Sequence, residues 1–528
     1  MSSSVEALEE KLKGNSLPPE AAEVAAARIK ALRASEPDSL EQVDTKFYLS
    51  ELLRMPWEKP SGVKFQPDRV PELLNLRFFG PTTIPEVLAN FLTEIYSAED
   101  PIPANWPTPV FFGPSGIGKR TLGRRIGEAV GRPVQVINLN LLESDADLFG
   151  VYTDRVRGRP GKIVEALQSS GRADPVVILA GLDWPVRTWQ DRGVSVIRFL
   201  FDPEARRNFR DRFLDVDLDL SRALFVGTAA SYDILPSESY RNLLPIDWAG
   251  YTRGRKLEIA TESLIPSLLA RHALKAEDFQ ILDAALETLV NDYTNESGVE
   301  DLERLLDYLC HRVAVVLATG GAALRPIDPG LVQELLGAPR KYGRDADAPP
   351  RTGVALGIVD SPDGAWVEQV EVAQIPGAEG YSLTGVASDS LSRVVDCSYH
   401  YLRSRMTEMD ITARQLYEYG YRVHMRSNGR VEDPAIALAV TAAFISQIRD
   451  RFVDPELALV GEITLNGRVL GAPGLHHKLL AAHRRGIHRL IVPRENRSDL
   501  DELPDDLKNE MSIVEVEEAD HAIRVALQ

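Results

Sequence analysis

The stretch PVFFGPSGIGKRTLG, residues 109 to 123, constrains the fold more than any other part of this sequence. A short apolar run predicts a buried strand, and a glycine-rich turn and a helix-forming segment follow it. Gly113, Gly118 and Lys119 have the spacing of a G-x-x-x-x-G-K-[ST] phosphate-binding loop, with Gly116 as a further glycine inside it. Backbone N–H groups of such a turn form a cradle for phosphate. We therefore expect a phosphate-loop fold, with a glycine-rich turn that holds no ligand as the alternative.

One residue departs from this pattern. Arg120 occupies the position where a small hydroxyl normally helps to hold Mg²⁺ against bound phosphates, and Thr121 follows it. Arg120 could be a fixed cation that binds phosphate without metal, or a surface or interface arginine tolerated because no metal is held. We favour the second interpretation.

The rest of the chain predicts a multidomain α/β protein. After residue 108, the β-rich runs VQVINLN, VVILAG and ALFVGTAA alternate with helical stretches, which is typical of buried parallel strands. The polar, proline-rich KYGRDADAPPR separates a helical region from a compact α+β region. We expect four segments: an N-terminal helical segment (1–62), an α/β phosphate-loop domain (63–252), a helical domain (253–340) and an α+β domain (341–528).

Composition excludes several classes of function. The net charge of −18 argues against a dedicated nucleic-acid surface. Cys310 and Cys397 are the only cysteines, so neither a disulfide framework nor a cysteine-based zinc site is expected. The start MSSSVEALEEK lacks the apolar core of a signal peptide, and the longest apolar stretch, AIALAVTAAFISQI, is too short to span a bilayer. We expect a cytoplasmic protein with neither nucleic acid nor membrane as a partner.

The order of segments resembles the Lon family of ATP-dependent proteases, in which an AAA+ ATPase module is fused to a Ser–Lys peptidase. The resemblance is carried, in order, by GPSGIGKRTLGRRIGEAVGRPV, RPGKIVEAL, FDPEARRNFRDRFLDVDLDLSRALFVGTA, AGYTRGRKLEIA, GVEDLERLL, VGEITLNGRVLGAPGLHHKLLAAHRRGI and IVPRENRSDLDELP. It implies an AAA+ module for residues 63–252, its helical lid for residues 253–340 and a Lon-type peptidase-like domain for residues 341–528. It also implies assembly into a homo-hexameric ring.

The resemblance assigns nucleotide chemistry to positions that this chain fills with other residues. The acidic Walker B pair corresponds to Ala180 and Gly181, and Asp183, two residues further on, does not share its geometry. The sensor of the γ-phosphate corresponds to Ala230, and the lid arginine corresponds to Glu300. Phosphoryl transfer depends on neutralised charge and a positioned water. We therefore expect no hydrolysis, no required cofactor, and at most weak binding of ATP or ADP.

Two substrate-handling positions also differ. Where the family grips substrate with an aromatic–aliphatic pair, this chain has Arg155 and Val156, with Tyr152 nearby. The family's arginine finger corresponds to Asn242, and Arg241 stands one residue early. We expect Arg241 to serve as an ion partner at a subunit interface.

The peptidase dyad is replaced at both positions. The resemblance places the nucleophilic serine at Ala435, after a turn in which Asp433 caps and Pro434 opens a helix. The general-base lysine corresponds to His476. A histidine can act as a base near neutral pH, but an alanine cannot attack a carbonyl. We expect no catalytic residues here.

Other residues do not replace the dyad. His424, His476, His477 and Glu462 have the side chains of a zinc site, but adjacent histidines diverge on a helix and no H-E-x-x-H pattern is present. We therefore expect no metal site.

Three further candidates have simple structural explanations. Ser427 fits a turn, Cys397 fits a small buried hydrophobe, and Thr464 fits strand and turn geometry.

Two hypotheses for function remain. The first is a Lon-like pseudoenzyme, a non-catalytic hexameric scaffold that binds peptides, a ligand or an active Lon paralogue in order to regulate it. The alternative is a divergent Lon-like peptidase that works without ATP or with weak dependence on it.

Overall fold

The computed structural model forms two compact units. One contains Met1–Gly113 and Gly118–Trp248, and the other contains Pro114–Ile117 and Ala249–Gln528. The residues that the structure describes are 17–35, 39–57, 65–76, 78–97, 106–152, 158–189, 191–230, 235–319, 326–339, 350–360, 364–377, 380–385, 388–409, 411–425, 432–501, 503 and 505–527, together with Leu8, Glu10 and Leu12.

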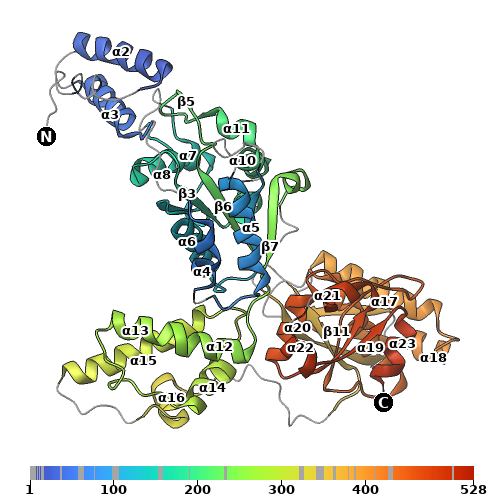
Figure 1. Cartoon of the computed structure of the whole chain (residues 1–528). Helices are drawn as coiled ribbons and strands as arrows, with labels where there is room; N and C mark the ends of the chain where they lie inside the picture. The colour runs from blue at the N-terminus through green and yellow to red at the C-terminus, as the bar shows by residue number, and fades with distance from the viewer. Residues whose placement is uncertain are drawn as a thin grey trace. The chain divides into compact units, whose positions relative to one another are not determined.

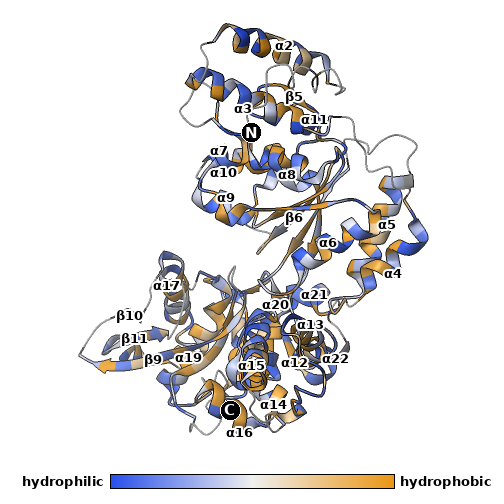
Figure 2. Ribbon diagram, turned by 90° about the vertical axis from the view of Figure 1, so that its left-hand side faces the viewer, coloured by the Kyte–Doolittle hydropathy of each residue, from blue (hydrophilic) through white to orange (hydrophobic). Residues whose placement is uncertain are grey.

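The first unit is built on a parallel sheet of five strands in the order β2-β3-β6-β1-β7. Strands β1, β3 and β6 are buried along their whole length, as continuous apolar runs in a covered parallel sheet should be. Figure 2 draws β6 largely in the hydrophobic colours. The strands are β1 (Thr108–Phe112), β2 (Val134–Asn138), β3 (Val176–Ala180), β6 (Leu224–Ala229) and β7 (Leu243–Asp247), and a separate two-stranded ribbon joins β4 (Phe209–Arg210) and β5 (Asp217–Leu218).

Helices surround this sheet (Figure 1). Helix α6 packs closely on it because Gly123 and Gly127 carry no side chain: a Cβ on Gly127 would lie 2.0 Å from Val134 Cγ2. The N-terminal helices α2 and α3 join the same unit, where the Tyr48 hydroxyl donates to Leu214 O at 2.6 Å. The helices are α2 (Pro19–Ala34), α3 (Leu40–Arg54), α4 (Val70–Asn75), α5 (Thr83–Ser97), α6 (Lys119–Val130), α7 (Asp145–Phe149), α8 (Lys162–Ser170), α9 (Asp183–Thr188), α10 (Asp191–Phe201) and α11 (Pro203–Arg207).

The second unit begins with a helical region. Its longest helix, α15, buries Leu302, Leu306, Leu309 and Val313, whose spacing places them on one face of the helix. The helices are α12 (Arg253–Ile259), α13 (Ile265–Arg271), α14 (Asp283–Thr288), α15 (Glu300–Ala318) and α16 (Pro329–Leu336), with single π-helical turns at Ala260–Leu264 and Leu289–Tyr293.

The C-terminal part of this unit is a mixed sheet of seven strands in the order β10-β11-β9-β8-β12-β15-β16. Strand β9 pairs antiparallel with β8 and β11, whereas the other neighbouring pairs are parallel. The strands are β8 (Val354–Val359), β9 (Trp366–Pro376), β10 (Tyr381–Gly385), β11 (Tyr419–Met425), β12 (Leu457–Leu459), β15 (Arg489–Pro493) and β16 (Ser512–Val516), and β13 (Glu462–Ile463) pairs with β14 (Val469–Leu470). The helices are α17 (Asp389–Ser404), α18 (Ala413–Tyr417), α19 (Ala437–Arg449), α20 (Leu475–Arg484), α21 (Arg497–Asp501), α22 (Asp505–Glu510) and α23 (Ala519–Ala526).

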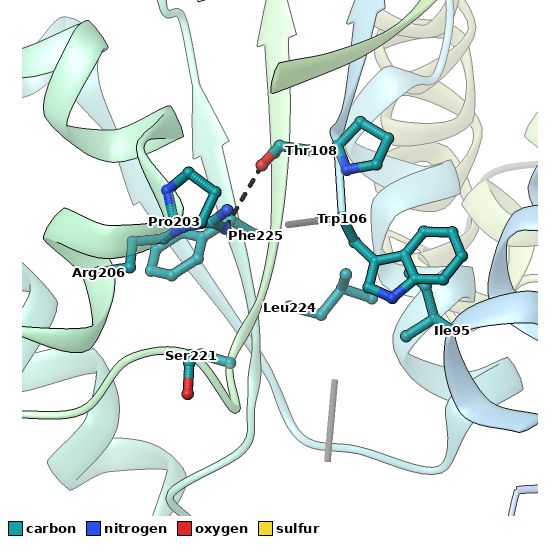
Figure 3. Close-up of a pocket in the computed structure, with 10 residues that line it drawn as sticks. Ile95, Trp106, Thr108, Pro203, Arg206, Ser221, Leu224 and Phe225 are labelled. Atoms are coloured by element: carbon teal, nitrogen blue, oxygen red, sulfur yellow. Dashed lines mark hydrogen bonds between the residues drawn. The ribbon is translucent and has the colours of Figure 1, made fainter. Parts of the chain in front are cut away.

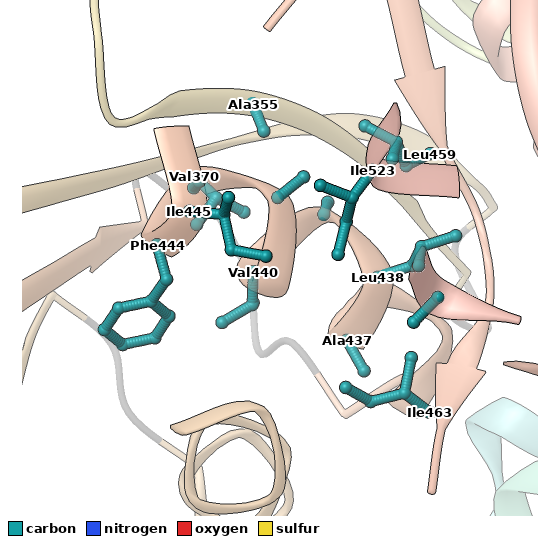
Figure 4. Packing of buried hydrophobic residues seen from close by; sticks show 14 of the residues in the cluster. Ala355, Val370, Ala437, Leu438, Val440, Phe444, Ile445, Leu459, Ile463 and Ile523 are labelled. Carbon is teal, nitrogen blue, oxygen red and sulfur yellow. The ribbon is translucent and has the colours of Figure 1, made fainter. Parts of the chain in front are cut away.

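Helix α19 is the centre of the C-terminal core. Its Leu438, Val440, Phe444 and Ile445 side chains are fully buried and pack among residues of β8, β9 and α23 (Figure 4). Strand β8 approaches the helix closely at Gly357, where a Cβ would lie 2.9 Å from Ala439 Cβ. The start of α19 therefore packs directly against β8.

This architecture confirms the predicted fold class: multidomain α/β, with N-terminal helices, a parallel phosphate-loop sheet, a helical region and a C-terminal α+β region. The boundaries of the four predicted segments stay predictions. Among the described helices, none has both the length and the apolar character needed to cross a membrane.

Candidate functional site

The phosphate loop has the predicted strand–turn–helix setting. It leaves β1 at Phe112 and enters α6 at Lys119. Gly116 and Gly118 have φ values of 74° and 96°, a conformation that favours glycine. Gly113 N–H is already used, because it donates to Ala230 O at 3.2 Å.

Lys119 folds back onto its own loop. Its Nζ donates to Gly113 O. Burial lowers the pKa of Lys119 to about 8; Arg120 lowers it further, whereas Asp183 and Asp247 oppose the shift. Asp183 and Asp247 therefore face the lysine at the carboxyl edge of the sheet. The sequence analysis set Asp183 aside and did not consider Asp247. The position of Asp247 at the end of β7 was the signal that could have identified this residue.

Arg120 and the next residue point to solvent. Arg120 and Thr121 are both exposed in the first turn of α6. This exposure is compatible with the surface interpretation of Arg120.

The positions assigned to the metal and water acids hold no acid. Ala180 ends β3, and Gly181 follows it with a φ of 84°. A Cβ at Gly181 would lie 2.0 Å from Asn140 Oδ1. An acidic side chain at position 181 would therefore have to move the exposed Asn140 side chain and accept a strained backbone.

The backbone N–H of Ala230, the residue that the family resemblance assigns to the sensor, is hydrogen-bonded to a carboxylate. Ala230 N–H donates to Asp183 Oδ1 at 3.3 Å, so the carboxylate next to β3 is engaged with the end of β6. Ala230 itself brings no polar side chain to this edge.

In the second unit, the turn before α15 contacts the middle of the loop. Val299 N–H donates to Gly116 O at 3.1 Å, and a Cβ on Gly298 would lie 2.4 Å from the carbonyl carbon of Gly116. Glu300 begins α15 beside this contact and is exposed. The Tyr251 hydroxyl donates to Ile117 O at 2.5 Å. Protein backbone and an acidic residue thus lie against Pro114–Ile117.

The nucleophile position is part of the apolar core. Asp433 Oδ1 accepts from Ala435 N–H at 2.9 Å and caps the 3₁₀ turn Pro434–Ile436, which leads into α19. Ala435 is 0% exposed and packs in a buried cluster with Leu475 and Leu479 of α20. Its methyl group presents no reactive atom to solvent.

A polar network lies beside Ala435. Lys478 Nζ is 2.9 Å from Asp433 Oδ2 and donates to Pro473 O at 2.5 Å. The same Asp433 Oδ2 accepts from Asp360 N–H at 2.8 Å. Asp360 Oδ2 in turn lies 3.3 Å from His477 Nδ1.

Sequence reasoning missed Lys478 and Asp360. The signal for Lys478 was its place three residues after Leu475 on the apolar face of a helix. His476, to which the family resemblance assigns the base, is half-buried in the first turn of α20, and the lysine that pairs with Asp433 beside Ala435 is Lys478.

The other candidates have ordinary contacts. His424 is exposed on β11, with Nδ1 3.1 Å from Thr384 Oγ1. Cys397 Sγ donates to Ile463 O at 3.3 Å, and burial, aided by the Glu462 carboxylate, raises the pKa of its thiol.

The remaining residues are placed as follows. Thr464 Oγ1 accepts from Arg468 N–H at 3.1 Å in the hairpin between β13 and β14. Arg241 is exposed, and Tyr152 is 48% exposed. Arg155, Val156 and Ser427 lie outside the described residues.

A pocket in the first unit lies away from the phosphate loop (Figure 3). It is lined by Thr108 and Leu224, which begin β1 and β6, so it is at the amino ends of the parallel strands. Arg206 Nη1 donates to Thr108 Oγ1 at 3.4 Å and its guanidinium lies over the Phe225 ring. Ligands of open α/β sheets bind at the carboxyl ends of the strands. This pocket is therefore not the candidate site.

Comparison with known proteins gives two family matches. Residues 326–528 match the Lon protease (S16) C-terminal proteolytic domain, and residues 270–325 match the Lon protease AAA+ ATPase lid domain.

Individual relatives match along nearly the whole of this chain. The chain is 32% identical over 524 residues to a Lon protease of Heliobacterium modesticaldum, covering 99% of this chain and 64% of that protein. It is 30% identical over 527 residues to Lon protease 2 of Sorangium cellulosum, covering 99% and 65%. The chain therefore spans less than two thirds of the length of these relatives.

Proposed function

The chain belongs to the Lon protease family, and on that premise we propose that it is a non-catalytic member, a scaffold or regulatory protein that assembles into a homo-hexamer. The observation that carries this proposal is Ala435. The residue that the family resemblance assigns to the nucleophile is an alanine whose side chain is 0% exposed in an apolar cluster.

The nucleotide positions support the same proposal. A water molecule can attack ATP only if a carboxylate or similar group positions it, and Mg²⁺ needs oxygen ligands near the phosphates. Position 180 has a methyl group, and Gly181 has no side chain. Any ATP or ADP bound at Lys119 would therefore act as a ligand and would not be hydrolysed.

A family member without peptidase and ATPase activity would act by binding other molecules. Peptides, a small ligand or an active Lon protease are the partners that this proposal allows. Mixed rings with an active family member would change that protein's rate in proportion to the fraction of inactive subunits.

The decisive experiment incubates the purified chain with an unfolded casein substrate, with and without ATP and Mg²⁺. An active Lon protease, such as that of Heliobacterium modesticaldum, is the positive control. We expect no cleavage and no phosphate release above the no-protein background in any condition. Cleavage without ATP would support the alternative, a divergent ATP-independent peptidase. Phosphate release that disappears in Lys119→Ala would contradict the loss of ATPase chemistry.

Assembly is tested separately by light scattering at micromolar concentration. We expect a mass near six subunits, and substitution of the exposed Arg241 by alanine should shift the distribution toward smaller species. A monomer insensitive to salt and nucleotide would contradict the ring, although it would leave the absence of catalysis untouched.

A further inference from the structure

We propose that His483, His488 and Glu510 form a binding site for a divalent transition-metal ion, with Zn²⁺ as the preferred ion. One ligand atom from each of the three side chains lies within 4.8 Å of the other two. Among the described residues, a group of at least three His, Cys, Asp or Glu side chains has ligand atoms that lie close enough together to share an ion. The group that meets this criterion is His483, His488 and Glu510. It includes neither His424 nor His476, the histidines weighed from the sequence.

A tight turn brings the two histidines together. Helix α20 ends in a Schellman motif: Ile487 N–H donates to Ala482 O at 3.0 Å, and Gly486 N–H donates to His483 O at 2.9 Å. Gly486 has a φ of 71°, which this motif requires and which glycine adopts without strain. The helix therefore ends between the two histidines, and the rings of His483 and His488 lie with centroids 5.7 Å apart at an interplanar angle of 89°.

Glu510 is held against the same turn. It ends α22, and its neighbours Leu507 and Met511 are buried in one apolar cluster with Ile487 of the turn. On the other side, Ser512 N–H donates to His488 O at 2.7 Å, which fixes the start of β16 beside β15. The backbones of the three ligands are thus positioned by the core and not by the ion.

The side chains already converge. His483 Nε2 lies 2.5 Å from Glu510 Oε2, and the His483 side chain is only 9% exposed. Its Nδ1 is buried with no hydrogen-bond partner among the described residues, so of the two ring nitrogens only Nε2 has a partner there. Glu510 has a side chain that is 57% exposed and can rotate to admit an ion.

The donor set selects the class of metal. Two imidazole nitrogens and one carboxylate oxygen suit Zn²⁺, whereas Ca²⁺ and Mg²⁺ prefer all-oxygen sets. Three protein ligands leave the fourth tetrahedral position for water. At metal–ligand distances of about 2.0–2.2 Å, the nitrogen and oxygen now in contact would separate to about 3.4 Å, a movement that the Glu510 rotamer can supply. An ion here would fasten α22 to the junction of α20 and β15.

The test uses the full chain without an affinity tag, freed of metal by a chelator and titrated with Zn²⁺ by calorimetry. Co²⁺ is used in parallel, because its visible absorption reports tetrahedral coordination. We expect one Zn²⁺ per chain, a rise in melting temperature, and slower hydrogen exchange in α22. Excess Mg²⁺ should not compete.

His488→Asn and Glu510→Gln should each weaken Zn²⁺ binding at least tenfold, and circular dichroism checks that both variants are folded. His521→Asn is the matched control, because His521 is an exposed histidine outside the cluster. Equal affinity in His488→Asn and His521→Asn would overturn the proposal, as would a wild-type chain that binds no Zn²⁺.

Discussion

The ammonium group of Lys478 lies 2.9 Å from the carboxylate of Asp433, and the two side chains are 0% and 6% exposed. Asp433 simultaneously accepts the backbone N–H of Ala435 through its other oxygen. The buried ion pair therefore joins α20 to the turn in which the family resemblance places the nucleophile. The lysine that reaches this turn stands two residues after His476 and also donates to Pro473 O.

Removing one partner of this pair should be costly. Lys478→Met leaves Asp433 buried without its counter-charge, so we expect a loss of about 3–5 kcal/mol in unfolding free energy. In a double-mutant cycle with Asp433→Asn, the double variant should lose less than the sum of the single variants, by about 0.5–3 kcal/mol. Urea denaturation followed by circular dichroism measures both quantities. Strict additivity would show that the two side chains do not interact.

Restoring the dyad tests whether the peptidase fold is intact. Ala435→Ser supplies an attacking oxygen, but the residue that the family resemblance assigns to the base is still His476, so this variant should stay nearly inert. Ala435→Ser with His476→Lys should regain slow, ATP-independent cleavage of small unfolded peptides, because a buried lysine amine can become neutral and act as a base. Ala437→Ser with His476→Lys is the matched control, because Ala437 is also buried two residues further on. A wild-type chain that cleaves as fast as the double variant would contradict the non-catalytic assignment.

Position 181 offers a test of the nucleotide site. Gly181→Glu places a side chain on a backbone with a φ of 84° and against Asn140, so the variant should lose about 1–3 kcal/mol of stability. Adding Asn140→Ala removes the clash but not the backbone strain, so part of the loss should be recovered. Thermal unfolding of the single and double variants measures this recovery. A Gly181→Glu variant as stable as the wild type would show that Asn140 moves freely.

Nucleotide binding should be insensitive to Mg²⁺. The family resemblance assigns phosphate contact to Lys119, whereas Ala180 and Gly181 offer no acid to a metal ion. We expect ATP affinity, measured by calorimetry, to change less than twofold on adding Mg²⁺ and to fall at least tenfold in Lys119→Ala. Arg124→Ala is the control, because Arg124 is exposed on the same helix. A strong Mg²⁺ dependence would point to a metal ligand such as Asp183.

Stability should depend on pH through Lys256. Burial, reinforced by the nearby Arg484, lowers the pKa of Lys256 from 10.5 to about 7, and its side chain is 2% exposed with Nζ donating to Glu296 O. Between pH 7 and 10.5 the unfolded chain binds more protons here than the folded chain, so unfolding free energy rises with pH across this window. Below pH 7 the full cost of burying the charge applies.

The measurable consequence concerns a variant. Lys256→Met removes the buried charge, so its melting temperature relative to the wild type should be highest near pH 7 and should fall as the pH approaches 10. Lys275→Met is the control, because the Lys275 side chain is 78% exposed. A constant difference between Lys256→Met and the wild type from pH 7 to 10 would contradict a lysine that loses its proton in this window.

The sequence predicts the parallel sheet well because its signals are local. Strands β1, β3 and β6 are continuous apolar runs, and the glycine spacing after β1 fixes the turn that follows. The cap at Asp433 is local too, since a carboxylate before proline marks the start of a helical turn.

The contacts that define the candidate site are not local. Asn140 and Gly181 meet only because β2 and β3 are neighbours, and Lys478 meets Asp433 only after α20 packs on the C-terminal sheet. Sequence spacing gave no reason to pair His483 with His488, because residues five apart on a helix face different sides. The Schellman turn ends the helix between these two residues, so helical spacing no longer determines where their side chains lie.

The contact between Gly181 and Asn140 also sets an order in time. A chain that acquired an acid at position 181 while Asn140 was present would meet both a clash and a strained backbone, whereas a chain that first replaced Asn140 by a smaller residue would meet the strained backbone alone. The second order is thus the less costly of the two, although the backbone opposes both. Evolutionary return of an acid to position 181 is therefore opposed by the backbone whichever substitution comes first, and the Asn140 side chain adds to that cost while it is present.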